Sequence, residues 1–321
     1  MTVAAEATAH RSRRRPRSKR IAQASVPYLL ILPVVVVITA ILGYPLYKLV
    51  VLSFQQYGLA ELIQAATSGA PAPWVGFDNY SSVLHDEVFW QVLLRTVIFT
   101  VANVALTIGL GTLIAFLLIR VSTWVRVPLT AALVLAWSMP AVVAVQIWLW
   151  MTNFENGVLN YVLTELHVGD YTGHDWYGST FSKLAMVTLL IVWGAIPFVT
   201  ITVYAGLAQV PRELVEAAEI DGAGPVRVFR DVTFPILKPI FLILTSLSII
   251  WDFGVFTQPY LLIGSSAVDT TNYLMGVYVF IEGYAHSDFG RGAAISLLML
   301  LIISVLSVFY VRRMVKMGEA S

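Results

Sequence analysis

Cysteine is absent from this 321-residue chain, and charged residues are scarce, at 12% of the total. Without thiols the chain forms neither disulfide bonds nor thiolate metal sites. Soluble domains carry about twice that share of charged residues, and 58% of this chain is hydrophobic. The composition therefore excludes an ordinary soluble protein and predicts an integral membrane protein.

The sequence also lacks the motifs of a nucleotide-hydrolysing enzyme. No G-x-x-x-x-G-K-[ST] phosphate-binding loop occurs, so this chain is not expected to hydrolyse ATP itself. His85, His167, His174 and His286 fall in predicted loops, at spacings that suit no metal site. We therefore predict no catalytic residue, no cofactor and no metal. The only dense basic block is a short N-terminal arm, which does not indicate a nucleic-acid partner.

Six apolar runs are each long enough to cross a bilayer, which requires about 20 residues of helix. They cover residues 28–52, 92–119, 128–151, 183–207, 239–263 and 292–311. The predicted fold is an all-α integral membrane protein with six transmembrane helices. Pro33, Pro45, Pro140 and Pro197 fall within these runs, and each is expected to kink or loosen its helix by removing a backbone hydrogen bond.

Most of the 20 Lys and Arg residues lie on one side of the predicted spans, whereas the loops on the other side are acidic. The densest basic group is in the N-terminal tail and consists of Arg11, Arg13, Arg14, Arg15, Arg17, Lys19 and Arg20. Because cationic segments stay in the cytoplasm, both termini are predicted to be cytoplasmic. The predicted organisation is a basic tail (1–22), a six-helix membrane domain (23–316) and a short cytoplasmic tail (317–321).

A polar segment over residues 208–238 separates the fourth and fifth predicted spans and faces the cytoplasm. Pro211 is typical of a helix start, and residues 212–220 are good helix formers. Gly and Pro within 221–225 predict a turn, and residues 226–232 are expected to form a second short helix. Small residues at such a bend would allow another protein to approach the backbone closely.

Asp252 is a carboxylate well inside the fifth predicted span. An aspartate in mid-membrane costs ~2.5–3.5 kcal/mol on insertion scales, so its side chain is expected to face a partner, a cavity or a pathway. Ser248 and Val255 fall on the same helix face, and Trp251 is adjacent. A carboxylate that accepts paired hydroxyls, beside a ring that covers the apolar face, suits a sugar. A structural pair with a neighbouring helix is the alternative.

The polar segment resembles the EAA loop of bacterial ABC-importer permeases. It reads Glu-Ala-Ala from Glu216, then three residues, Gly222, nine residues and Val-x-Phe-Pro. The family pattern has leucine where Phe234 stands, and every spacing matches. The resemblance implies a type I importer permease fold, similar to maltose permeases, in a bacterial cytoplasmic membrane. It also implies that an ATPase contacts Glu216, Ala217, Asp221, Gly222 and Ala223.

Two further stretches, 193–198 and 251–253, are similar to elements of maltose-type sugar permeases. The likeness extends from about residue 25 to residue 315 and includes the Gly-Arg-Gly-Ala-Ala sequence at 290–294. In that family the helices that carry the two stretches line the transmembrane sugar site. The resemblance therefore implies a substrate site formed by Ala195, Phe198, Ser248, Trp251, Asp252 and Val255.

The function implied by the resemblance is that of a transmembrane subunit of an ATP-driven, binding-protein-dependent oligosaccharide importer. Such a subunit forms half of the translocation pathway and is not itself an enzyme. The implied partners are a second homologous permease, a cytoplasmic ABC ATPase dimer, an extracytoplasmic sugar-binding (lipo)protein, a small-molecule carbohydrate and membrane lipid. The alternatives are an ABC permease for another solute, an ion-coupled secondary transporter that uses Asp252, and a membrane-anchored assembly protein.

Two departures from the family pattern affect the outer loops. The usual T-x-G-G-P after the fifth span reads Ile-Gly-Ser-Ser-Ala at residues 263–267, which leaves the turn there undefined. Arg95 stands where the family usually has asparagine before Thr96. We expect the Arg95 side chain to snorkel to the outer interface, because a charged group is costly within the bilayer.

Overall fold

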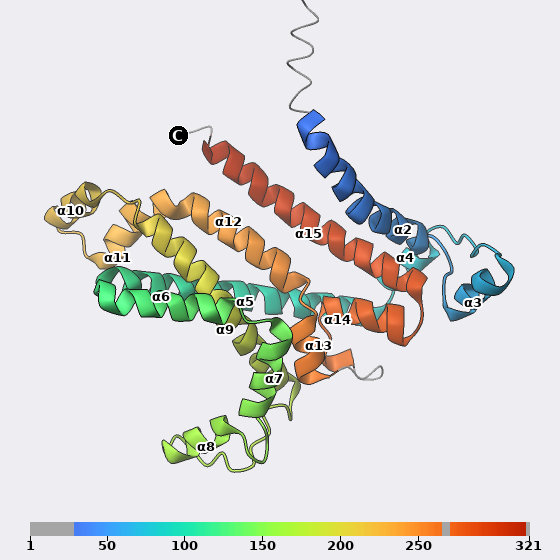
Figure 1. The fold of residues 1–321 in the computed structure, drawn as a ribbon, viewed down its shortest axis with the longest axis horizontal. Coiled ribbons are helices and arrows are strands. Elements are labelled where there is room, and N and C mark those ends of the chain that lie inside the picture. The colour runs from blue at the N-terminus through green and yellow to red at the C-terminus, as the bar shows by residue number, and fades with distance from the viewer. Residues whose placement is uncertain (1–28, 265–269, 319–321) are drawn as a thin grey trace, which may run out of the picture. The chain divides into compact units, whose positions relative to one another are not determined.

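The computed structural model describes residues 29–264 and 270–318 (Figure 1). Within these residues the regular structure is helical, and the β-type pairing is limited to two isolated bridges. The all-α prediction is therefore confirmed. The predicted basic tail at 1–22 and most of the serine-containing outer loop at 263–267 lie outside the described residues.

Among the described residues, the predicted spans correspond to five long apolar helices and one bent helix pair. The helices are Leu29–Ser53, α5 (Glu87–Arg120), α9 (Thr180–Leu207), a continuous helix from Pro225 to Phe253, and α15 (Phe289–Gly318). The bent pair is α6 (Thr123–Trp137) and α7 (Ala141–Met151). Counted as one span, this pair completes the six that were predicted.

Shorter helices connect these spans. They are α3 (Leu59–Ser68), α4 (Asp78–Leu84), α8 (Val158–Glu165), α10 (Arg212–Ile220), α13 (Thr257–Ile263), η3 (Thr270–Asn272), α14 (Met275–Phe280) and η4 (Ile281–Ala285). The first span contains a π-helical turn, η1 (Thr39–Gly43), directly before α2 (Tyr44–Ser53). This turn lies just N-terminal to Pro45, where the missing N–H prevents the regular hydrogen bond.

The third predicted span, 128–151, is broken rather than kinked. Helices α6 and α7 meet at 100°, with the break at residues 138–140. Pro140 stands immediately before α7 and has an extended ψ of 136°. A proline cannot donate the next helical hydrogen bond, and it disfavours helical conformation at the preceding Met139. The residues on both sides of Pro140 are apolar, so hydrophobicity alone does not distinguish this broken span from a continuous one. Pro197, in contrast, lies inside α9 without ending it.

The fifth predicted span, 239–263, is also two helices. Helix α12 (Phe234–Phe253) ends at Gly254, and α13 begins at Thr257. Pro259 does not cause this break, because it is the third residue of α13. The first N–H groups of a helix have no partner within it, so a proline is tolerated there.

Helices α5 and α9 pack closely through a glycine contact. A Cβ added at Gly111 would lie 2.7 Å from Cγ1 of Val199 and 3.3 Å from the backbone nitrogen of Thr200. The Thr200 hydroxyl also donates a hydrogen bond of 3.2 Å to the Gly111 carbonyl. A buried cluster that includes Val199 joins α5 and α9 to α12. The absence of a side chain at Gly111 therefore allows the close approach of α5 and α9.

Substituting Gly111 by alanine should destabilise the folded chain by about 1–3 kcal/mol, the usual cost of overpacking. Gly109 is the matched control, because nothing lies within 4 Å of the position that its Cβ would take. Gly109→Ala should leave stability unchanged or raise it slightly, since alanine favours helix over glycine. Thermal unfolding of the purified complex in detergent measures both. Equal midpoints for the two variants would contradict the glycine contact.

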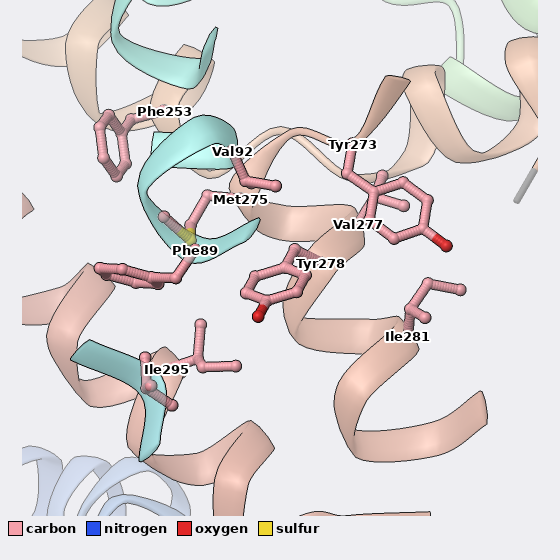
Figure 2. Close-up of a cluster of buried hydrophobic side chains, with 10 residues drawn as sticks. Phe89, Val92, Phe253, Tyr273, Met275, Val277, Tyr278, Ile281 and Ile295 are labelled. Atoms are coloured by element: carbon pink, nitrogen blue, oxygen red, sulfur yellow. The ribbon is translucent and has the colours of Figure 1, made fainter. Parts of the chain in front are cut away.

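A second buried cluster holds the segment after α13 against α5 and α15. Figure 2 shows the Tyr278 ring of α14 surrounded by side chains that include Phe89 of α5, Met275 of α14 and Ile295 of α15. Burial raises the pKa of Tyr278 to about 12, so its phenol stays protonated at neutral pH. That proton is donated to Oδ2 of Asp86 across 3.1 Å.

The carboxylate of Asp86 belongs to an ion-pair network centred on Arg291, at the start of α15. The Arg291 guanidinium bonds to Asp86, lies 3.1 Å from a Glu282 oxygen, and donates to Ser82 across 2.8 Å. Asp86 also caps α5 by accepting the Val88 N–H. The pairs are largely shielded from water, because their side chains are only 14–24% exposed. The network fixes the adjacent ends of α5, η4 and α15.

Candidate functional site

A cavity of about 260 Å³ lies where α6, α7, α9, α12 and α13 come together (Figure 1). Its position follows from the two helix breaks, which turn α7 and α13 away from the helices before them. Five of the six predicted substrate residues line it: Ala195, Phe198, Trp251, Asp252 and Val255. The sixth, Ser248, is buried on α12 one turn before Asp252 and is not part of the lining.

Asp252 presents an unpaired carboxylate to this cavity. The residue is only 6% exposed, and it forms neither a hydrogen bond nor an ion pair with the part of the chain that the structure describes. A structural pair with a neighbouring helix, the alternative raised from the sequence, therefore has no partner among these residues. A carboxylate shielded from water is costly unless a ligand or another subunit supplies donors.

Aromatic rings form one wall of the cavity. The Phe198 ring lies between two indoles, with centroid distances of 6.0 Å to Trp137 and 5.6 Å to Trp251. Trp137 is nearly parallel to it at 19°, and Trp251 is edge-on at 63°. Both tryptophans are about half exposed, at 53% and 51%. The cavity therefore offers flat apolar surfaces beside the carboxyl group of Asp252 and the amide of Gln258.

Several lining residues were absent from the predicted substrate site. They are Ala136, Trp137, Met139, Ala141, Ala144, Leu190, Ile191, Trp193, Gly194 and Gln258. Those from α6 and α7 reach the cavity only because the chain turns through 100° at Pro140, which a straight third span would not allow. A tryptophan three residues before a proline in an apolar run was the available signal. Gln258 could be recognised in the sequence as an uncharged polar residue that follows the end of α12.

The polar segment after α9 forms an elbow, which we define as residues 212–228. Helix α10 covers Arg212–Ile220, as predicted. Gly222 then adopts φ +81°, a left-handed conformation that glycine enters without a steric cost. The Ala223 N–H closes the end of α10 by donating to the Ala218 carbonyl across 2.9 Å. Pro225 occupies the first position of the next helix, where its missing N–H has no consequence.

The second part of the elbow differs from the prediction. The expected separate helix over 226–232 is instead α11 (Pro225–Val228), which continues through a π-helical turn, η2 (Phe229–Thr233), into α12. The π-helical turn lies just before Pro235, which cannot donate a regular helical bond, so the wider turn allows the helix to continue.

Apolar side chains on the elbow are directed outward. Leu214, Ile220 and Val226 are 49%, 86% and 81% exposed. Of the five predicted coupling residues, Glu216, Ala217, Asp221 and Gly222 are exposed and Ala223 is half-buried. The structure therefore brings all five together on one short, largely accessible segment.

Backbone carbonyls of the segment between α13 and α14 bind the Arg95 side chain. Its guanidinium donates to the carbonyls of Thr270 and Tyr273 across 3.1 and 2.9 Å. The adjacent Thr96 hydroxyl accepts the Met275 N–H across 2.9 Å. Burial of a charged group is offset here by carbonyl acceptors about 175 positions away in the chain, a contact that local sequence does not reveal. Across the described residues, no group of three or more acidic or histidine side chains could hold a metal ion.

Comparison with known proteins identifies the family. Residues 107–315 match the family described as "Binding-protein-dependent transport system inner membrane component". The diacetylchitobiose uptake system permease protein DasB of Streptomyces coelicolor is 43% identical over 95% of this chain and 91% of its own length. The sulfoquinovosyl glycerol transport system permease protein SmoG of Agrobacterium fabrum is 32% identical, with 88% of each chain covered.

The fold has a match among solved structures. A chain in the crystal structure of a bacterial ABC transporter involved in the import of the acidic polysaccharide alginate superposes with a TM-score of 0.75. The match covers 93% of this chain and 98% of that chain, at 17% sequence identity. It therefore supports the predicted importer-permease fold. The family match covers more than half of the sequence, and this protein is a member of the binding-protein-dependent transport system inner membrane components, a permease subunit embedded in the membrane.

Proposed function

We propose that this permease imports carbohydrates and that the cavity around Asp252 is its transmembrane substrate site. The observation that carries the proposal is the unpaired carboxylate beside the Phe198 and Trp251 rings. The carboxylate accepts hydrogen bonds from sugar hydroxyls, and the rings cover the apolar face of a pyranose. Relatives named for diacetylchitobiose and sulfoquinovosyl glycerol uptake support a saccharide or glycoside as the substrate.

The proposed transport mechanism involves three kinds of partner. A binding protein delivers the sugar from outside, and a second homologous permease supplies the other half of the pathway. A cytoplasmic ATPase dimer receives the elbow, whose exposed Leu214, Ile220 and Val226 provide apolar contact area. Residues 23–316 act as one permease domain, with the 208–238 segment as its coupling loop. ATP-driven closure of the ATPase dimer displaces the elbow and reorients the helices around the cavity.

Uptake by cells tests this function. Cells that carry the complete transport system should accumulate radiolabelled N,N′-diacetylchitobiose, maltose or trehalose, and deletion of this permease should abolish that accumulation. ATP depletion should stop uptake, whereas a proton ionophore applied at maintained ATP should not. Uptake that follows the ion gradient would identify a secondary transporter instead. Competition by peptides or polyamines, without competition by sugars, would contradict the carbohydrate assignment.

The proposed orientation places both termini and the elbow in the cytoplasm, which the distribution of Lys and Arg supports. Because the chain has no cysteine, a single introduced thiol reports its own location. A membrane-impermeant maleimide should label Asp175→Cys in intact cells and should label Ala217→Cys only after the membrane is permeabilised. The two sites are matched, since both are exposed in loops between spans. Labelling of Ala217→Cys in intact cells would reverse the orientation.

A further inference from the structure

A groove distinct from the substrate cavity runs between α5, α12 and α15. Its volume is about 710 Å³, and most of its wall is apolar. Gly109 and Leu113 contribute from α5, Phe234 and Phe241 from the elbow side of α12, and Phe309 from α15. Figure 1 shows the C-terminal part of α15 running alongside the first half of α12.

Two cations line the groove. Lys238 is in the first turns of α12 and Arg313 is in the last turns of α15. Both side chains are exposed, and neither forms an ion pair within the described part of the chain. The Arg313 guanidinium instead lies 4.7 Å from the centre of the Phe309 ring. The groove residues include no acidic side chain, so the positive charge of Lys238 and Arg313 is not balanced within the groove.

Phenylalanine rings line the groove on both sides of Lys238 along the same helix. The ring centroids of Phe234 and Phe241 are 5.5 Å apart, and those of Phe229 and Phe234 are 5.9 Å apart. Nothing lies within 4 Å of the position that a Gly109 side chain would take, so the α5 side is open. Cationic groups above an elongated apolar channel match an amphiphile with an anionic head and a hydrocarbon tail.

We propose that this groove binds one anionic phospholipid, with its phosphate between Lys238 and Arg313 and an acyl chain along the phenylalanine wall. Basic pockets between transmembrane helices on the cytoplasmic side recognise anionic headgroups in this manner. The assignment of this lipid to the cytoplasmic leaflet rests on the orientation proposed above. The preference for an anionic headgroup does not depend on that orientation. Because the groove includes Phe229 and the start of α12, the bound lipid braces the helix that leads from the elbow to the cavity.

Native mass spectrometry of the purified importer complex tests the selectivity. The complex should retain dioleoylphosphatidylglycerol in preference to dioleoylphosphatidylcholine during titration in detergent. Each cation near a membrane surface contributes a factor of about five to affinity, so the double variant Lys238→Gln/Arg313→Gln should bind phosphatidylglycerol about 25-fold more weakly. Arg312→Gln is the matched control, because it removes a neighbouring exposed charge of α15 that does not line the groove.

Two results would overturn the lipid site in this titration. One is equal binding of the two lipids by the unmodified complex. The other is a loss of about fivefold in Arg312→Gln, the same loss per charge as in the double variant, which would indicate diffuse charge attraction. Neither result depends on transport activity. The titration can therefore contradict the lipid site without contradicting the proposed carbohydrate transport, and the reverse also holds.

A photocrosslink identifies the occupant without removing any charge. With p-benzoylphenylalanine in place of Phe241, irradiation in native membranes should give an adduct that contains phospholipid. An adduct to a polypeptide, either the second permease or the first span of this chain, would show that a helix occupies the groove and would overturn the proposal.

Discussion

Gly222→Asp should leave the importer assembled but reduce sugar uptake at least about tenfold, as expected when a central contact of an interface is lost. At φ +81° an aspartate incurs only modest strain, and apart from its chain neighbours no described residue has an atom within 4 Å of its Cβ. The chain should therefore fold normally. The new carboxylate would instead project from the outer bend of the elbow, where the proposed ATPase docks.

The readouts for this variant are uptake, recovery of the ATPase with the purified complex, and ATP hydrolysis stimulated by the loaded binding protein. Stimulation should be lost while the subunits still co-purify. Gly222→Asn is the matched control, since asparagine has the same size and tolerates the same backbone conformation without the charge. Unchanged uptake in Gly222→Asp would remove the elbow from the mechanism, and loss of the folded chain would assign Gly222 to folding.

Asp252→Ala should reduce uptake by about 10- to 100-fold, which corresponds to the loss of one or more charged hydrogen bonds to the substrate. The amount of permease in the membrane should not fall, because the carboxylate has no partner within the described chain whose bonds would be lost. Removing an unpaired buried charge relieves a desolvation cost rather than creating one. Uptake of radiolabelled sugar, normalised to immunodetected permease, measures the effect.

The control for this variant is Ser246→Ala, which alters a half-buried hydroxyl on the same helix away from the cavity lining. It should transport normally. A large fall in the amount of Asp252→Ala in the membrane, with normal transport per molecule, would contradict a substrate role. Such a result would mean that the carboxylate is satisfied by another subunit and supports assembly.

The spans and the elbow were predictable from the sequence because their signals are local. Long apolar runs, the distribution of Lys and Arg, and the glycine at position 222 each act within a few residues of where they appear. The breaks were harder to locate, because a proline has different effects at different helix positions. Pro140 stands just before a helix and breaks the span, Pro259 is accommodated in a first turn, and Pro197 remains inside α9.

The candidate site was predictable along one helix but not across helices. Helical spacing brought Val255 into line with Asp252, and both line the cavity. It could not show that Trp137 stacks on Phe198, because that contact depends on the 100° turn between α6 and α7. The partners of Arg95 could not be predicted for a similar reason, since the carbonyls that accept its hydrogen bonds come from Thr270 and Tyr273.

The unbroken helix from Pro225 to Phe253 joins the elbow to the carboxylate of Asp252 without a hinge. Its 1.5 Å rise per residue makes this connection about 40 Å long, so a tilt of about 5° at one end displaces the other by about 3.5 Å. That displacement exceeds the length of a hydrogen bond. If Asp252 binds the substrate as proposed, such a displacement would withdraw the acceptor from a bound sugar and release it.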